Sequence, residues 1–330
     1  MTLLSFALAT GLLLAFLYVV GVDEVVATLL AADTGAIGGL TAVVFCWIAA
    51  WSASLRVVLQ RSDLPHPLVR TYLAYTTMMF WDNVTPLSTA VADPVAAGVL
   101  ARAFDIEYER SLAVVITVDF LNFAPSPLFA VFGLLYVALT AVGGERIETI
   151  AGPLLAVLLV IAVGSVLVWR HRRQLGERAV SVLGALESTV RRLRPGRASG
   201  DRLAFERRVE RLIQHLETVA ASRRTLVTVL LLAVAGWALL ALALWLSLYA
   251  VGVGTPVGIA LFAVPLVTVT ELLPLPGGVG GLEPLLVLLL VPTTGGGIVA
   301  VTAGVVLFRM GTHWFPIVCG GAALPVLLYR

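Results

Sequence analysis

The chain has 330 residues and a formal net charge of +2; 59% of its residues are hydrophobic, only 13% are charged, and the mean hydropathy is +0.99. Soluble domains are about 45–50% apolar and about 25% charged. The composition therefore excludes a soluble enzyme, a nucleic-acid-binding protein or a disordered chain as a description of the whole sequence. It predicts an integral membrane protein that forms a single polytopic domain over residues 1–330.

Six apolar stretches are long enough to cross the hydrocarbon core as helices, which takes about 20 residues. In chain order they cover residues 3–22, 36–59, 110–142, 152–169, 226–251 and 298–328. The third contains Asp119 and the break Pro125-Ser126-Pro127, so we expect one long kinked span there.

Two further apolar blocks, residues 66–101 and 257–296, are interrupted by prolines, glycines and acidic residues. Each is expected to return to the side of the membrane from which it came, the first as a hairpin from the cytoplasm and the second as one from outside. The predicted fold class is therefore all-α, with about eight transmembrane helices that include two re-entrant or half-span hairpins.

Basic residues are concentrated in residues 170–224, which hold 14 of the 22 basic and 6 of the 20 acidic residues, a local net charge of +8. Because cytoplasmic loops are enriched in arginine, this insertion and the N-terminus are predicted to lie in the cytoplasm, and the protein in the cell membrane. The apolar spacing predicts two amphipathic helices in the insertion. They fit a surface for anionic lipid headgroups or an ordinary positively charged loop.

The two interrupted blocks share a sequence frame of a proline, six residues, an acid and a second proline. It reads Pro86 to Asp93-Pro94 in the first block and Pro276 to Glu283-Pro284 in the second. Paired Gly/Pro-interrupted segments in the two halves of a membrane protein indicate a transport site. The alternative is a coincidence between two proline-rich kinks.

Three motifs resemble the flippase-like membrane domain of lysylphosphatidylglycerol synthases. Pro276-Gly277-Gly278-Val279-Gly280-Gly281-Leu282-Glu283 resembles its Pro-Gly-Gly-x-Gly-x-x-Glu stretch, and residues 309–316 resemble its late arginine-containing span. Asn83-Val84-Thr85-Pro86, followed by Asp93-Pro94, resembles its Asn-x-x-Pro…Gly-Gly-Glu-Pro segment, although Val91-Ala92 replaces the glycine pair and Asp93 the glutamate. The resemblance implies translocation of a lipid-linked or aminoacylated headgroup, not its synthesis.

Arg309 lies near the middle of the last predicted span, where an unpaired charge costs about 2.5–3.5 kcal/mol on insertion scales. It therefore needs an acidic partner, and the candidates are Glu271, Glu283 and Asp119. The pair is either a ligand site or a structural ion pair. Arg102, at the cytoplasmic end of the first hairpin, is either a contact for phosphate or an ordinary interfacial arginine.

Glycines 277–281 should expose backbone N–H groups ahead of a helix N-terminus, which attracts anions. The carboxylate of Glu283, in the first turn of that helix, would either occupy the positive field of this N-terminus or repel an anion from it. The acids thus favour a cationic headgroup or proton coupling and the arginines favour phosphate, so a zwitterionic or aminoacylated headgroup satisfies both. His313, four residues after Arg309 on the same helical face, is either a proton shuttle or a packing histidine.

The sequence therefore predicts a lipid flippase or transporter for a phosphate-bearing or aminoacylated headgroup. The alternative is a non-transporting membrane partner of a lipid-linked glycosyltransferase or another lipid-modifying enzyme. We expect no enzyme activity, no cofactor, no metal and no nucleic-acid partner; the expected partners are membrane lipids, including anionic lipids or lipid-linked sugar phosphates. The candidate pathway residues are Asn83, Pro86, Asp93, Arg102, Asp119, Glu271, Pro276, Gly277, Gly278, Gly280, Glu283, Arg309 and His313.

Overall fold

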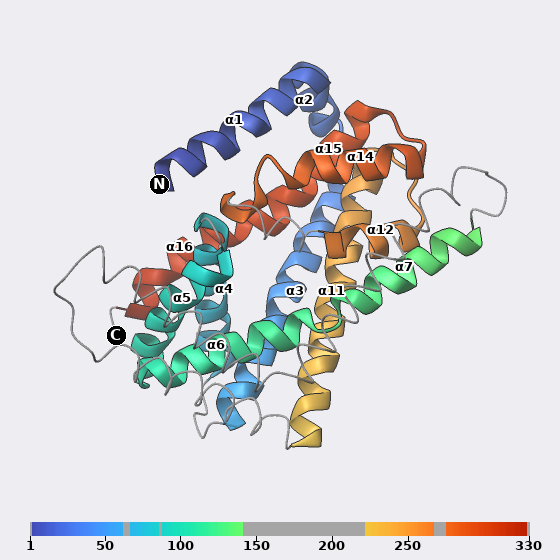
Figure 1. The fold of residues 1–330 in the computed structure, drawn as a ribbon. Helices are drawn as coiled ribbons and strands as arrows, with labels where there is room; N and C mark the ends of the chain where they lie inside the picture. The colour runs from blue at the N-terminus through green and yellow to red at the C-terminus, as the bar shows by residue number, and fades with distance from the viewer. Residues whose placement is uncertain (1, 62–66, 86–87, 141–221, 267–274, 329–330) are drawn as a thin grey trace, which may run out of the picture.

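The computed structural model describes residues 2–61, 67–85, 88–140, 222–266 and 275–328, and every regular element in these ranges is helical (Figure 1). The α-helices are α1 (Thr2–Val20), α2 (Val22–Leu30), α3 (Thr34–Arg61), α4 (Leu68–Val84), α5 (Ser88–Phe104), α6 (Tyr108–Phe123), α7 (Ser126–Thr140), α11 (Arg223–Ala250), α12 (Val257–Ala263), α14 (Leu282–Thr294), α15 (Ile298–Arg309) and α16 (Phe315–Leu328). Short turns are the 3₁₀ turns η1 (Val264–Leu266) and η2 (Pro276–Gly278) and the π turn η3 (Met310–Trp314).

The protein is a multi-pass membrane protein with fewer spans in its described residues than the sequence predicted. Five stretches are long and apolar enough to cross a membrane: Thr34–Gln60, Tyr108–Gly133, Arg223–Ala250, Pro276–Thr294 and Ile298–Leu328. α1 and α2 pass the same test only as a bent pair, which gives at most six, so the predicted count of about eight is not confirmed. The predicted span at 152–169 and most of the basic insertion at 170–224 lie outside the described residues.

The first predicted span ends in a sharp bend. Gly21 has φ +107°, a conformation that glycine adopts without a Cβ penalty, and α2 leaves α1 at 85°. Asp23 and Glu24, which follow this span in the sequence, form the first turn of α2, where acidic side chains suit the helix dipole. Asp33 then begins α3, because its side chain accepts a hydrogen bond from the Ala36 N–H at 2.6 Å.

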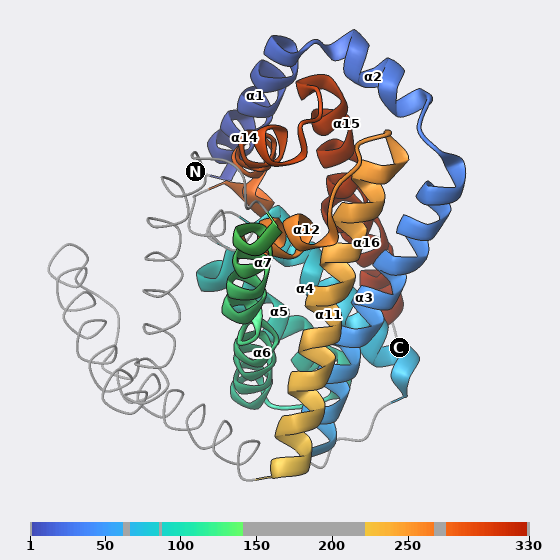
Figure 2. The same cartoon turned by 90° about the vertical axis from the view of Figure 1, so that its right-hand side faces the viewer.

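The centre of the bundle is formed by α3 and α11, which lie side by side in both views (Figures 1 and 2). Their close approach depends on Gly236 of α11, because a Cβ there would lie 1.9 Å from Nε1 of Trp51 on α3. The Trp51 ring also lies 6.0 Å from that of Trp237 and 6.1 Å from that of Phe123, so one aromatic cluster joins α3, α11 and α6.

The predicted kinked span corresponds to α6 and α7, which follow one another almost in line (Figure 1). Pro125 and Pro127 carry no N–H, so the break deprives carbonyl groups one turn earlier of their usual donors. The Asn122 carbonyl, in the last turn of α6 just before the break, is buried and accepts a hydrogen bond from the indole N–H of Trp237 at 2.7 Å. A side chain of α11 thus stabilises the break in a buried position, where an unpaired carbonyl would be costly.

The two interrupted blocks each form a helix, a break and a second helix. In the first block α4 and α5 pack against each other on either side of residues 85–87, and in the second α12 packs against α14. α4 also packs against α16 and against η2. The break of the first block is therefore brought next to the glycine-rich turn of the second block and to the last span.

Candidate functional site

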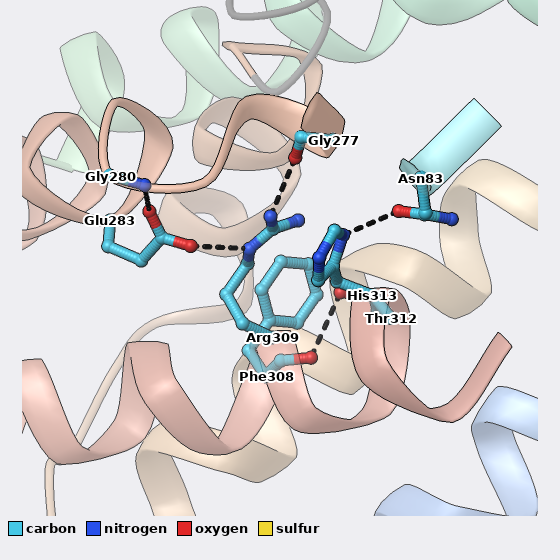
Figure 3. Close-up of polar contacts among 8 residues, drawn as sticks. All are labelled: Asn83, Gly277, Gly280, Glu283, Phe308, Arg309, Thr312 and His313. Carbon is cyan, nitrogen blue, oxygen red and sulfur yellow. Dashed lines mark hydrogen bonds and ion pairs between the residues drawn. The ribbon is translucent and has the colours of Figure 1, made fainter. Parts of the chain in front are cut away.

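The predicted site residues that the structure brings together lie where four segments meet: the end of α4, the glycine turn at residues 276–281, the first turn of α14 and the junction of α15 with η3 (Figure 3). Each of these segments departs from, or terminates, a regular helix. Backbone of this kind is tolerated at membrane depth only where protein buries it or where it lines a cavity.

The glycine turn has three residues in the left-handed region, namely Gly277 at φ +54°, Gly278 at +68° and Gly280 at +78°. Side chains with a Cβ enter this region at a cost of about 1–2 kcal/mol per residue. The turn directs the Gly277 carbonyl and the Gly280 N–H toward side chains of other segments. These two backbone groups form hydrogen bonds that position the charged side chains of Glu283 and Arg309.

Arg309 forms an ion pair with Glu283, with 2.8 Å between Nε and Oε1. Its Nη2 donates to the Gly277 carbonyl at 2.7 Å, and the Gly280 N–H donates to the other Glu283 oxygen at the same distance. Arg309 is 6% exposed and Glu283 3%. Among the three acidic candidates, the structure therefore selects Glu283 as the partner of Arg309.

Helix polarity favours the acidic member of this pair. Glu283 lies in the first turn of α14, the end that stabilises a negative charge, whereas Arg309 lies where α15 continues through the π turn into α16. Glu283 also reaches back to an N–H ahead of its own helix, as the acidic residue of a capping box does. Of the two expectations for Glu283, that it would occupy or repel the field of this helix N-terminus, the geometry matches the first.

His313 lies in a π turn that separates it from Arg309. The Phe315 N–H bonds to the Met310 carbonyl, five residues earlier, and the Thr312 hydroxyl donates to the Phe308 carbonyl at 2.9 Å. Single π turns inside helices are frequent at functional sites. No pattern in the sequence predicts this turn, because residues 298–328 form one continuous apolar stretch.

His313 is 2% exposed, and its Nδ1 lies 2.6 Å from Oδ1 of Asn83 on α4 (Figure 3). Gly277 packs between the two, because a Cβ at this position would lie 2.3 Å from Cε1 of His313 and 3.0 Å from the Asn83 carbonyl oxygen. The two interrupted blocks and the last span thus meet at one glycine.

The site has an additional wall that sequence reasoning missed. Ala9 and Leu13 of α1 pack with Leu275 and Val279, on either end of the glycine turn. A Cβ on Gly280 would lie 2.5 Å from the Ala9 carbonyl oxygen. Gly280 is therefore required for the approach of α1 as well as for its backbone conformation, and no motif in α1 indicates this contact.

Three predicted residues lie elsewhere on α5 and α6. Asp93 is partly exposed within α5, immediately before Pro94, and Arg102 is exposed in the last turn of that helix. Asp119 is partly exposed on α6 and is not the partner of Arg309, whose hydrogen bonds within the described residues go to Glu283 and Gly277. Pro86 and Glu271 lie outside the described residues, while Pro276 and Gly278 form part of the glycine turn.

Comparison with known proteins identifies the family. The family model described as "Lysylphosphatidylglycerol synthase TM region" matches residues 2–320, which is nearly the whole chain. A search of curated proteins finds no match. The chain therefore belongs to the lysylphosphatidylglycerol synthase transmembrane-region family, as the glycine motif and the arginine-containing span indicated.

Proposed function

We propose that this member of the lysylphosphatidylglycerol synthase transmembrane-region family moves a phospholipid with a phosphate-bearing or aminoacylated headgroup across the membrane. The observation that carries the proposal is the buried ion pair of Arg309 and Glu283, set between a glycine turn and a π turn. A headgroup crosses a bilayer only where polar groups replace its water, and this cluster supplies such groups inside the apolar bundle.

The chemistry of the pair suits a headgroup that carries both charges. The guanidinium of Arg309 binds phosphate oxygens through charge-assisted hydrogen bonds. Glu283 can accept the ammonium group of an ethanolamine or aminoacyl headgroup. A ligand with both groups can replace each half of the ion pair without leaving the other half as an isolated buried charge, which would cost several kcal/mol.

The surroundings of the pair support a transport site over an ordinary ion pair that holds helices together. Interrupted helices whose ends face a polar residue near mid-membrane are typical of transporters. Glu283 lies at such a helix end, Arg309 lies at the π turn within the last span, and a third interrupted segment contributes Asn83. A pair that only held helices together would need neither the left-handed glycine turn nor the π turn.

We also propose that the protein lies in the cell membrane with its N-terminus and the basic insertion in the cytoplasm. The support is the positive-inside distribution of arginine, which places 14 of the 22 basic residues in residues 170–224. In this orientation the basic insertion would meet the anionic leaflet, where lipid headgroups are collected before translocation.

Translocation by the purified protein in liposomes tests the proposal. Acyl-chain-labelled phospholipids are incorporated, and dithionite added outside bleaches only the label in the outer leaflet. In vesicles with the wild-type protein, label from the inner leaflet should become accessible to dithionite faster than in protein-free vesicles. Arg309→Ala and Glu283→Gln should each lower this translocation rate at least tenfold, which corresponds to about 1.4 kcal/mol in the activation free energy.

Matched substitutions at exposed positions provide the controls. Arg110→Ala on α6 and Glu24→Gln on α2 remove the same charges from exposed sites and should leave the rate unchanged. Equal rates for the buried-site variants and the wild type would contradict the site assignment. Absence of translocation, together with co-purification of a lipid-modifying enzyme that depends on the arginines of the insertion, would instead support the role of a non-transporting partner.

A further inference from the structure

The hydrogen bonds of Asn83 determine which nitrogen of His313 carries the proton. The Asn83 Nδ2 donates to the Met79 carbonyl at 2.8 Å, and a carbonyl only accepts, so the amide orientation is fixed. The amide oxygen then faces His313 Nδ1 at 2.6 Å, and it too only accepts. Nδ1 must therefore carry the hydrogen, and the neutral ring presents Nε2 as a bare acceptor.

This acceptor has no hydrogen-bond partner among the described residues. In Figure 3 the imidazole and the guanidinium of Arg309 lie next to each other, with the unbonded ring nitrogen on the Arg309 side. Arg309 uses Nε and Nη2 for its protein partners, so Nη1 likewise forms no hydrogen bond within the described part of the chain. An acceptor of His313 and a donor of Arg309, two buried side chains that both contact Gly277, thus form no hydrogen bond within the described residues.

We propose that His313 determines headgroup specificity by accepting a hydrogen bond from a hydroxyl or ammonium donor of the lipid headgroup while Arg309 binds its phosphate. This inference rests on the proposed function and adds the class of substrate. Arg309 only donates and the neutral His313 only accepts at Nε2, so the pair matches a phosphodiester with an O–H or N–H group nearby. A quaternary ammonium headgroup has a phosphate but no such donor.

Asn83 acts in this scheme as a positioning residue. It touches no substrate, but its amide oxygen holds the tautomer that leaves Nε2 free, as partners of the second ring nitrogen do for histidines in other sites. The contact of the His313 ring with Gly277 adds a steric constraint, because the glycine leaves the ring no space on that side.

Three acyl-chain-labelled lipids of the same chain composition test the proposal in liposomes: phosphatidylglycerol with hydroxyl donors, phosphatidylethanolamine with an ammonium donor, and phosphatidylcholine with neither. The wild type should move at least one of the first two about tenfold faster than phosphatidylcholine, the size of one well-formed hydrogen bond. Which of the two is faster identifies the donor as a hydroxyl or an ammonium group.

Variants of His313 and Asn83 connect this preference to the acceptor. His313→Phe should reduce the rate ratio to about one by slowing only the donor-bearing lipid, whereas His313→Gln, whose amide oxygen accepts a hydrogen bond, should keep part of the ratio. Asn83→Leu should lower the ratio and Asn83→Asp, which still accepts from Nδ1–H, should restore it. A merely structural role would change all three rates together and leave their ratio intact.

Native mass spectrometry of the detergent-purified protein with the same three lipids measures headgroup preference without transport. A binding preference that His313→Phe abolishes, in a protein that moves no lipid, would overturn the proposed function and support the site. Translocation that depends on Arg309 but is equally fast for all three lipids would overturn the inference and support the function. A ratio that survives in His313→Phe would also overturn the inference.

Discussion

The ion pair of Arg309 and Glu283 should be strongly coupled in stability, and a double-mutant cycle measures this directly. Glu283→Leu leaves the guanidinium, 6% exposed, without a counter-charge, and Arg309→Met leaves the carboxylate, 3% exposed, in the same state. Removing one member of a buried pair costs about 3–5 kcal/mol. We therefore expect each single variant to lose about that much free energy of unfolding.

The double variant should be more stable than either single one. It removes both charges and leaves the Gly277 carbonyl and the Gly280 N–H without their side-chain partners, for which about 1–3 kcal/mol in total is expected. The interaction free energy of the cycle should therefore exceed about 3 kcal/mol. By contrast, residues that do not interact give additive effects within about 0.5 kcal/mol.

Denaturant titration in mixed micelles, followed by tryptophan fluorescence, measures the unfolding free energies, and the liposome assay measures transport by the same preparations. We expect the double variant to be folded but inactive. Additive destabilisation by the two substitutions would refute the structural reasoning. Wild-type transport by the double variant would show that the pair only holds the helices together.

Two further predictions concern close packing around the site and the helix break. Gly277→Ala should destabilise the protein by about 2–4 kcal/mol in thermal unfolding, because the new Cβ would lie at a positive φ and 2.3 Å from His313. The control is Gly98→Ala, where a Cβ meets nothing within 4 Å. This substitution should be neutral or stabilising. Trp237→Phe should cost about 1–3 kcal/mol in the same assay by leaving the Asn122 carbonyl unpaired, and an unchanged melting temperature would contradict the stabilising role of this hydrogen bond.

The sequence was sufficient to predict the long membrane-spanning helices, because an apolar stretch of about 20 residues indicates a span by its length alone. Three predicted spans, 36–59, 226–251 and 298–328, are found in the described residues within a few positions of their expected bounds. The break at Pro125 was also predictable, because proline removes a donor wherever it occurs. These features depend on local composition and on the thickness of the bilayer, so they require no knowledge of the tertiary structure.

The arrangement of the site was predictable only in part. The buried position of Arg309 required an acidic partner, but hydropathy could not choose between Glu283, Glu271 and Asp119, since that choice depends on which helices touch. The contact of His313 with Asn83 joins residues 230 positions apart. The bend at Gly21 was missed because a positive φ leaves no periodic signature in the sequence.

The location of Glu283 explains how the backbone N–H groups of a glycine turn ahead of a helix are compensated within this bundle. Its carboxylate bonds one backbone N–H of the turn with one oxygen and Arg309 with the other, so the helix end and the guanidinium are both neutralised by a single charge. A simple anion that displaced this carboxylate from Arg309 would leave Glu283 buried without a counter-charge. A headgroup that carries phosphate and ammonium together leaves no charge unpaired. Under the proposed function, the ion pair should therefore favour substrates that bring a positive charge together with the phosphate.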